Sequence, residues 1–248
     1  MSAEALNVLI AGGSSPSGTA VARALRDAGH TVFTVGSDTG RIAAASAAAG
    51  SGVTPLTCDL ADPDAVRGLR AGLTERGVRL DGVIHLVGGW RGAKGITDQS
   101  DEDWEFLERN AVTTLRNVSR TFYEDLAASE TGRLAIVSST AAAAPTAGGA
   151  SYAAAKAAAE AWTLAVADGF RRDQSAQAEP GTTVPPAKQH SAAVILVVKA
   201  LVDDAMRAAA PERKFPGFTD VADLADAVAG LFQAPAAELN GRRLPLSR

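Results

Sequence analysis

The chain alternates short runs of consecutive apolar residues with longer segments in which apolar residues recur every three or four positions. Continuous apolar runs are typical of strands buried on both faces of a sheet, whereas the longer spacing is typical of helices. This pattern predicts strands at residues 7–11, 31–35, 53–58, 82–87, 133–138, 192–198 and 242–246. It predicts helices at residues 19–28, 41–49, 101–128, 151–170 and 221–232, and a further helix that opens at Asp62-Pro63, an N-cap followed by a first-turn proline.

Strands that alternate with helices predict an α/β fold, a doubly wound parallel sheet of about seven strands with helices on both faces. The length of 248 residues suits one such Rossmann-like domain spanning residues 1–248. Ligands of these sheets bind beyond the carboxyl ends of the strands, where the glycine turn after residue 11, Gly88 and Ser139 all fall. Residues 171–191 are polar and without periodicity, which predicts a long flexible surface loop; a substrate or partner flap is the alternative.

Composition narrows the possible partners and the compartment. A formal charge of −4 and a pI near 5.4 argue against a nucleic-acid partner or an anionic membrane surface. Neither a signal peptide nor a membrane span is apparent in the sequence. The single cysteine, Cys58, fits a reducing cytoplasm, and the scattered histidines predict no metal site.

Ser139, Tyr152 and Lys156 form the pattern Ser-x12-Tyr-x3-Lys, and Asn110 lies 29 positions before the serine. On a helix, Tyr152 and Lys156 share a face, so the ammonium can approach the phenol oxygen. A nearby positive charge favours the phenolate, so we expect Lys156 to lower the pKa of Tyr152. A phenol with such a pKa is usable as a general acid or base near neutral pH.

These residues resemble the catalytic set of the short-chain dehydrogenase/reductase family, and the resemblance extends over nearly the whole chain. It implies that Tyr152 exchanges a proton with the substrate oxygen while hydride passes to or from a nicotinamide. It implies that Ser139 orients and polarises the carbonyl, and that Lys156 also holds the nicotinamide ribose. Asn110 would position a water in the proton relay. The expected function is thus an NAD(P)-dependent interconversion of a small ketone or aldehyde with an alcohol.

The turn Ala11-Gly-Gly-Ser-Ser-Pro-Ser-Gly18 stands where the family has Thr-Gly-x-x-x-Gly-x-Gly. Gly12 and Gly18 match, whereas Pro16 replaces the middle glycine. A helix N-terminus attracts a pyrophosphate through its unpaired N–H groups, and proline removes one of these donors. Proline is nevertheless comfortable in the first turn of a helix. The hydroxyls of Ser14, Ser15 and Ser17 are the expected replacements.

The resemblance also places Asp59, Leu60 and Gly88 beside the cofactor, with Asp59 on the adenine amino group. The family's Asn-Asn-Ala-Gly corresponds here to His85-Leu-Val-Gly88, in which only the glycine is kept. The end of the second strand selects the cofactor, since an acid there binds the ribose of NAD and a base favours NADP. Gly36 occupies the usual acidic position and Ser37 could bind a phosphate, while Asp38 would oppose it; the balance slightly favours NADP.

Beyond the sixth strand the resemblance weakens. Lys199-Ala200 and Asp203 or Asp204 replace the Pro-Gly and threonine that help to hold the nicotinamide carboxamide in the family. The segment 201–219 is where such enzymes fold over the substrate, and its Met206, Phe215 and Phe218 suit either a pocket wall or the core.

Two other functions are compatible with this sequence. Pro16 and the lost motifs suit a non-catalytic dinucleotide-binding protein with a redox-sensing or scaffold role, which has no need of a serine–tyrosine pair. Epimerisation or dehydration on the same scaffold is the other, although no additional acid or base singles it out. The family commonly pairs the helices expected at 101–128 and 151–170 across a subunit interface, which implies a homodimer or homotetramer.

Overall fold

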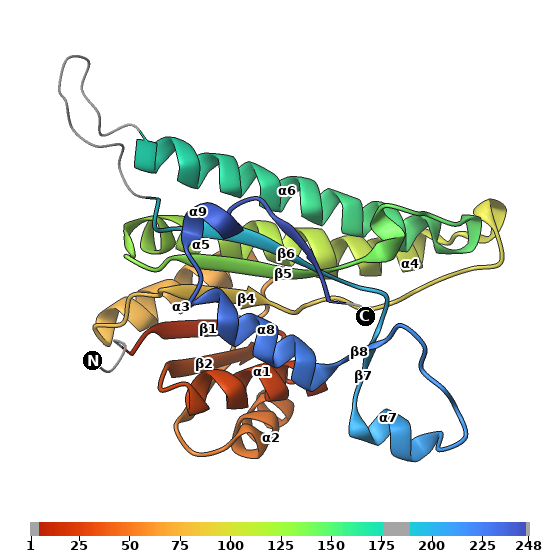
Figure 1. Cartoon of the computed structure of the whole chain (residues 1–248), viewed down its shortest axis with the longest axis horizontal. Helices are drawn as coiled ribbons and strands as arrows, with labels where there is room; N and C mark the ends of the chain where they lie inside the picture. The colour runs from red at the N-terminus through yellow and green to blue at the C-terminus, as the bar shows by residue number, and fades with distance from the viewer. Residues whose placement is uncertain (1–4, 176–188, 247–248) are drawn as a thin grey trace.

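A computed structural model describes residues 5–175 and 189–246, and its centre is a seven-stranded parallel sheet (Figure 1). The strand order is β3-β2-β1-β4-β5-β6-β9, so the order reverses between β1 and β4. The bounds are β1 (Asn7–Ala11), β2 (Thr31–Gly36), β3 (Val53–Thr57), β4 (Gly82–His85), β5 (Arg133–Ser139), β6 (Ala192–Val198) and β9 (Arg243–Pro245). The predicted doubly wound α/β fold is confirmed.

Each strand supplies two separate cores because its side chains point alternately to opposite faces of the sheet. In β1, Val8 and Ile10 belong to one apolar cluster, and Leu9 and Ala11 belong to the other. The first cluster is covered by α1 (Pro16–Asp27), α8 (Val221–Leu231) and α9 (Ala236–Leu239), with α2 (Thr39–Ala49) beside α1. The second is covered by α3 (Pro63–Glu75), α5 (Thr114–Ala128) and α6 (Ala150–Ser175) (Figure 1).

The helix predicted at residues 101–128 is present but changes its winding near its middle. It consists of α4 (Asp101–Glu108), a π-helical turn over Arg109–Thr113, and α5. π-Helical turns are rare and occur frequently at functional sites. Asn110 lies inside this turn.

The loop prediction for residues 171–191 is wrong at its start, because α6 continues through Ser175. Gln174 explains the extension: its Oε1 accepts the N–H groups of His190 (3.0 Å) and Ser191 (3.1 Å), and its Nε2 donates to Ser191 Oγ at 2.7 Å. These contacts tie the end of α6 to the chain just before β6. The middle of the predicted loop, residues 176–188, lies outside the described residues.

Small elements surround the carboxyl edge of the sheet. A parallel pair, β7 (Leu201–Val202) and β8 (Thr219–Asp220), flanks α7 (Asp204–Ala209). Lys199 Nζ donates to Pro216 O at 3.1 Å and so fastens this excursion to the end of β6. Short 3-10 turns lie at Ile96–Asp98, Thr140–Ala142 and Ala147–Gly149. Within the described parts of the chain, no helix combines the length and apolar character needed to cross a bilayer.

Candidate active site

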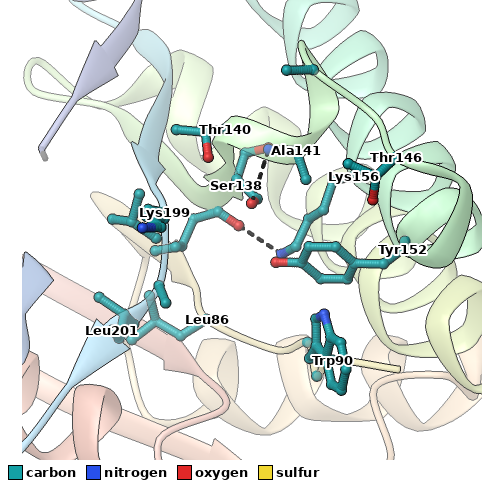
Figure 2. Close-up of a pocket in the computed structure, with 18 of the residues that line it drawn as sticks. Leu86, Trp90, Ser138, Thr140, Ala141, Thr146, Tyr152, Lys156, Lys199 and Leu201 are labelled. Atoms are coloured by element: carbon teal, nitrogen blue, oxygen red, sulfur yellow. Dashed lines mark hydrogen bonds between the residues drawn. The ribbon is translucent and has the colours of Figure 1, made fainter. Parts of the chain in front are cut away.

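A cavity of about 650 Å³ opens at the carboxyl ends of β4, β5 and β6, and it brings Ser139, Tyr152 and Lys156 together. Ser139 is the last residue of β5, and the other two lie on the first turns of α6. Figure 2 shows Tyr152 and Lys156 entering from α6, with Trp90 beside Tyr152 and Leu201 on the opposite side. The remaining lining comes from Ser17, Leu86–Gly89, Ala93, Val137, Ser138, Thr140, Ala141, Ala144, Thr146, Gly148, Gly149 and Val198–Ala200.

The Lys156 ammonium is held inside the protein, with 9% of the residue exposed. Its Nζ donates to Val137 O at 2.8 Å and lies 5.9 Å from the centroid of the Tyr152 ring. Burial lowers the pKa of Lys156 to about 8, and the Glu160 carboxylate one turn further along α6 opposes that shift. Glu160 is itself fixed by Ser138 Oγ at 2.6 Å and by Arg243 Nε at 2.8 Å.

The expected lowering of the Tyr152 pKa is not found. Burial of the phenol raises the pKa of Tyr152, because removal from water penalises the phenolate. The Ser139 hydroxyl acts in the opposite direction but is the weaker influence. The same Ser139 Oγ accepts a hydrogen bond from Ala141 N–H at 3.2 Å, which fixes the serine at the start of a 3-10 turn. The cavity therefore holds Tyr152 as a neutral phenol.

Asn110 lines an adjoining cavity, and two residues that the sequence had not singled out fix its backbone. Thr114 Oγ1 donates to Asn110 O at 2.6 Å and lies 2.9 Å from His85 Nε2. Burial, with the Lys156 charge as a second cause, lowers the pKa of His85 to about 3, so the imidazole is neutral at pH 7. Because the threonine proton is engaged by Asn110 O, His85 Nε2 carries the hydrogen and donates to Thr114 Oγ1. The only feature of the sequence that indicated this contact was a histidine, His85, within an apolar strand.

The adjoining cavity has a volume of about 280 Å³ and contains most of the predicted cofactor-binding residues. Gly12, Ser14, Ser15, Ser37, Asp59, Leu60 and Gly88 all line it, together with Arg41, Asn110 and Thr114. Leu86, Val87 and Gly88 line both cavities, so the two cavities adjoin and together form a groove at the carboxyl edge of the sheet, at its switch point. Ser17 lies on the catalytic side of these shared residues.

The glycines of the turn after β1 are required by close approaches of backbone. Gly12 has φ +82°, and a Cβ there would lie 2.9 Å from Leu86 C. Gly18 does not line either cavity; a Cβ at this position would lie 2.7 Å from Gly12 O. Ser15 is the N-cap of α1, with Oγ accepting from Gly18 N–H at 3.0 Å, and Pro16 occupies the first turn as predicted.

Two acidic residues near this end already have partners. Asp38 is the N-cap of α2: its Oδ1 accepts from Arg41 N–H at 2.7 Å, and this bond is the main cause that lowers the pKa of Asp38. Asp59 Oδ2 accepts from Arg109 Nη2 at 2.7 Å, and Oδ1 accepts from Ala61 N–H at 3.0 Å. Asp62 caps α3, as the sequence predicted.

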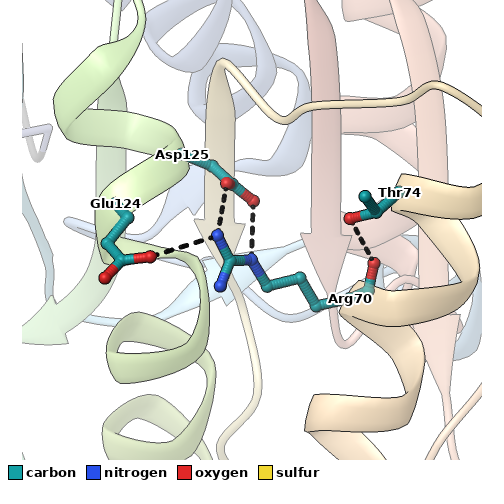
Figure 3. Close-up of polar contacts among 4 residues, drawn as sticks. All are labelled: Arg70, Thr74, Glu124 and Asp125. Atoms are coloured by element: carbon teal, nitrogen blue, oxygen red, sulfur yellow. Dashed lines mark hydrogen bonds and ion pairs between the residues drawn. The ribbon is translucent and has the colours of Figure 1, made fainter.

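A second groove, of about 770 Å³, lies between α3 and α5 on the outside of the sheet. Arg70 bridges its floor, with Nη2 at 2.8 Å from Asp125 Oδ1 and 3.4 Å from Glu124 Oε2 (Figure 3). These contacts raise the pKa of Arg70 and tie the two helices together. This groove exceeds the cavity around Tyr152 in volume, yet none of the predicted site residues lines it. Volume alone therefore does not identify the functional site here.

The fold, with its groove at the switch point, places the protein in the Rossmann-like class of doubly wound α/β folds. The sequence model described as short chain dehydrogenase matches residues 6–192, three quarters of the chain. The chain therefore belongs to the short-chain dehydrogenase/reductase family of oxidoreductases. No curated protein sequence matches it.

Solved structures agree in fold. An NAD+-bound xylitol dehydrogenase is 17% identical, with a TM-score of 0.78 over 98% of this chain and 97% of the other. A short-chain dehydrogenase of Shigella flexneri, solved with NADP, is 18% identical, with a TM-score of 0.80 over 97% and 96%. A short-chain dehydrogenase/reductase of Mycobacterium ulcerans is 21% identical, with a TM-score of 0.82 over 99% and 89%. At these identities the likeness concerns the fold.

Proposed function

We propose that the protein is an NAD(P)-dependent oxidoreductase that interconverts a ketone or aldehyde with an alcohol by hydride transfer. The observation that carries this proposal is that the two cavities of the groove adjoin. Ser139, Tyr152 and Lys156 meet in one half, the glycine–serine turn lines the other, and Leu86–Gly88 belong to both. A dinucleotide laid along the groove would bring its nicotinamide to the catalytic half. When bound, the nicotinamide would supply or accept the hydride.

The protein's own residues would handle the proton. In the reducing direction, Tyr152 donates its phenolic proton to the substrate oxygen as that oxygen gains electron density, and the carbonyl becomes a hydroxyl. The raised pKa of Tyr152 keeps the phenol protonated before the reaction, and the buried Lys156 ammonium stabilises the phenolate left behind. Ser139 orients the carbonyl oxygen, and the His85–Thr114 pair fixes the backbone of Asn110.

The preferred cofactor in this proposal is NADP. Ser37 and Arg41 line the nucleotide half of the groove, whereas Asp38, the acid nearest to them, is engaged as the N-cap of α2. A serine and an arginine suit the additional phosphate of NADP, and a capping carboxylate is poorly placed to accept from a ribose hydroxyl. The related structures do not decide the question, because one holds NAD+ and another NADP.

A non-catalytic dinucleotide-binding role is the second candidate. Pro16 leaves the first turn of α1 with one N–H donor fewer. The Asp59 carboxylate accepts hydrogen bonds from Arg109 and Ala61 rather than from an adenine. Both features lower the expected affinity for a dinucleotide cofactor. Nothing in a binding role, however, calls for a buried serine and lysine beside a tyrosine around a second cavity.

We further expect a homodimer or homotetramer. A shallow groove of about 390 Å³ runs between α5 and α6, lined by Tyr123, Trp162, Val166 and Gly169 among others. The exposed Leu164 lies on the same helix as Trp162. Sedimentation equilibrium would distinguish these states from a monomer.

The deciding experiment is a titration with NADPH and NADH, followed by a carbonyl panel. We expect saturable binding of at least one nucleotide and its oxidation by part of the panel. Tyr152→Phe should lower kcat by roughly 10²- to 10⁴-fold, the range of a lost general acid. The chain has one other tyrosine, so Tyr123→Phe is the matched control and should keep its activity. If both nucleotides fail to bind at millimolar concentration, the enzyme proposal is wrong. If a nucleotide binds but Tyr152→Phe turns over normally, the assigned mechanism is wrong.

A further inference from the structure

Trp90 is the most exposed of the large apolar side chains in the described residues, at 67%, and it stands in the wall of the catalytic cavity. Single exposed apolar residues are common on protein surfaces and by themselves indicate nothing. Trp90 differs by its position, because Figure 2 shows its ring directed at the cavity beside Tyr152. By contrast, Trp162 uses its indole N–H internally and donates to Ser119 Oγ at 2.8 Å.

The backbone on both sides of Trp90 is tightly constrained. A Cβ at Gly89 would lie 2.7 Å from the Phe106 ring, so only glycine lets the chain pass there. The Arg91 guanidinium sits 4.0 Å above the centroid of the same ring and 3.4 Å from Asp103. These contacts bind the residues flanking Trp90 to α4.

Further along, the same loop is fastened to the start of the catalytic helix. Ala93 N–H donates to Gly148 O at 2.8 Å. Gln99 Nε2 donates to Gly95 O (3.1 Å) and Gly148 O (3.3 Å), and its Oε1 accepts Ser151 N–H at 3.1 Å. Ser151 precedes Tyr152. The Trp90 loop and the Tyr152 helix are thus held to each other, so the aromatic face is presented at a set place relative to the reacting hydroxyl.

Small residues form part of the remaining lining of the cavity: Ala93, Ala141, Ala144, Gly148 and Gly149. Small side chains leave space for a flat group. None of the described residues that line the cavity is an acid, so no carboxylate there would pair with an ammonium. Its hydrogen-bonding groups, Ser139 and Tyr152, suit a carbonyl or hydroxyl oxygen. The wall that Trp90 forms is therefore aromatic, whereas Ser17, Ser138, Thr140, Thr146 and the two lysines add polar groups elsewhere in the lining.

We propose that this half of the groove takes a carbonyl compound whose C=O is attached to an aromatic ring, or the matching benzylic alcohol, with the ring stacked on Trp90. The chemistry of turnover rests on the proposed function, whereas binding of the ring does not. Aromatic pairs contribute about 0.5–1.5 kcal/mol beyond the burial of their area, so a ring is favoured over a saturated group of similar size.

The kinetic test compares acetophenone with cyclohexyl methyl ketone, which has the same carbonyl on a saturated ring. Trp90→Leu keeps an apolar side chain but removes the aromatic face, and we expect kcat/KM for acetophenone to fall roughly 2- to 12-fold more than for the cyclohexyl compound. Trp104→Leu is the matched control, because Trp104 is also exposed (41%) but does not line the cavity. Equal losses on both ketones, or no loss on either, would overturn the proposal.

A binding measurement separates this proposal from the enzyme proposal. 1-Phenylethanol and 1-cyclohexylethanol are titrated by calorimetry into the protein without added cofactor, for the wild type and both variants. Tighter binding of the phenyl compound, lost in Trp90→Leu and kept in Trp104→Leu, supports the aromatic site even if no ketone is reduced. Equal binding of the two alcohols, or no binding at millimolar concentration, overturns it even if ketones are reduced.

Discussion

The two halves of the groove are built in opposite ways. In the catalytic half, Lys156 and Ser139 are buried: Lys156 Nζ donates to Val137 O of β5, and Ser139 Oγ accepts from Ala141 N–H. The buried His85 lines neither cavity and bonds to Thr114 of α5. In the nucleotide half, Arg41 and Asp59 are exposed: Arg41 is paired with Asp38, and Asp59 accepts from Arg109 and Ala61 at the surface. Burial makes every polar group of the catalytic half expensive to leave unpaired, whereas the surface contacts of the other half are cheap to exchange. The proposed chemistry thus depends on buried contacts, and the proposed choice of cofactor depends on exposed ones.

The largest expected effect concerns His85 in acid. Its pKa is lowered in the folded protein to about 3 from 6.5. Between these values the unfolded chain binds more protons than the folded one, so stability is complete above pH 6.5 and falls as the pH drops towards 3. His85→Gln does not titrate, so from pH 7.5 to 4.5 the wild type should lose on the order of 2–3 kcal/mol more than the variant.

Urea unfolding at the two pH values measures this difference. Groups such as His30, whose pKa burial also lowers, are common to both proteins and cancel. If the free energy of unfolding fell equally in both proteins, protonation of His85 would cost the folded state nothing. The surroundings of His85 would then be less rigid than its hydrogen bonds imply.

His85→Leu is expected to have the next largest effect, since it removes the donor to Thr114 and leaves a buried hydroxyl with one partner fewer. The free energy of unfolding should fall by about 1–3 kcal/mol. Because Thr114 holds Asn110 O, kcat should fall by roughly tenfold while KM for the cofactor changes little. His85→Gln offers an amide N–H at a similar reach and should recover most of kcat. If kcat of His85→Leu equalled that of His85→Gln and of the wild type, His85 would contribute to stability but not to the position of Asn110.

These tests depend on contacts that the sequence could predict only in part. The strands and the order Asn110, Ser139, Tyr152, Lys156 follow from local patterns, because burial on both faces and helical spacing are properties of short segments. The contact that reaches the π-helical turn, from His85 through Thr114 to Asn110 O, joins residues 29 positions apart and is not visible in a local pattern. The extension of α6 depends on Gln174 meeting residues 190 and 191.

The Tyr152 pKa shows the same limit. The spacing of Tyr152 and Lys156 indicated that the two side chains share a helix face, and the distance from Nζ to the ring agrees. The direction of the Tyr152 pKa shift, however, is decided by the burial of the phenol, and burial is a property of the whole fold. The spacing of the residues predicts the neighbouring charge of Lys156, but it does not predict the loss of water around the phenol of Tyr152.

Arg41→Ala tests the rim of the nucleotide half. Losing a charged partner of the extra phosphate should weaken NADPH binding by roughly tenfold at low salt, with NADH changed less than about twofold. The effect should shrink at high salt because the Arg41 side chain is 71% exposed. Fluorescence titration of both nucleotides at two ionic strengths measures it. Equal weakening of NADH and NADPH would contradict the preference for NADP and make Arg41 a support for α2.

The smallest expected effect is at Pro16, between the two halves. Pro16→Ala restores an N–H in the first turn of α1 without disturbing the Ser15 cap, whose Oγ bonds Gly18 N–H at 3.0 Å. A pyrophosphate is common to both nucleotides, so the affinities for NADH and NADPH should rise together, by about 2- to 5-fold. Loss of the rigid ring should cost about 0.4–1 kcal/mol of stability. Weaker binding in the variant would mean that the proline shapes the turn and that the serine hydroxyls, not the helix N–H groups, hold the phosphates.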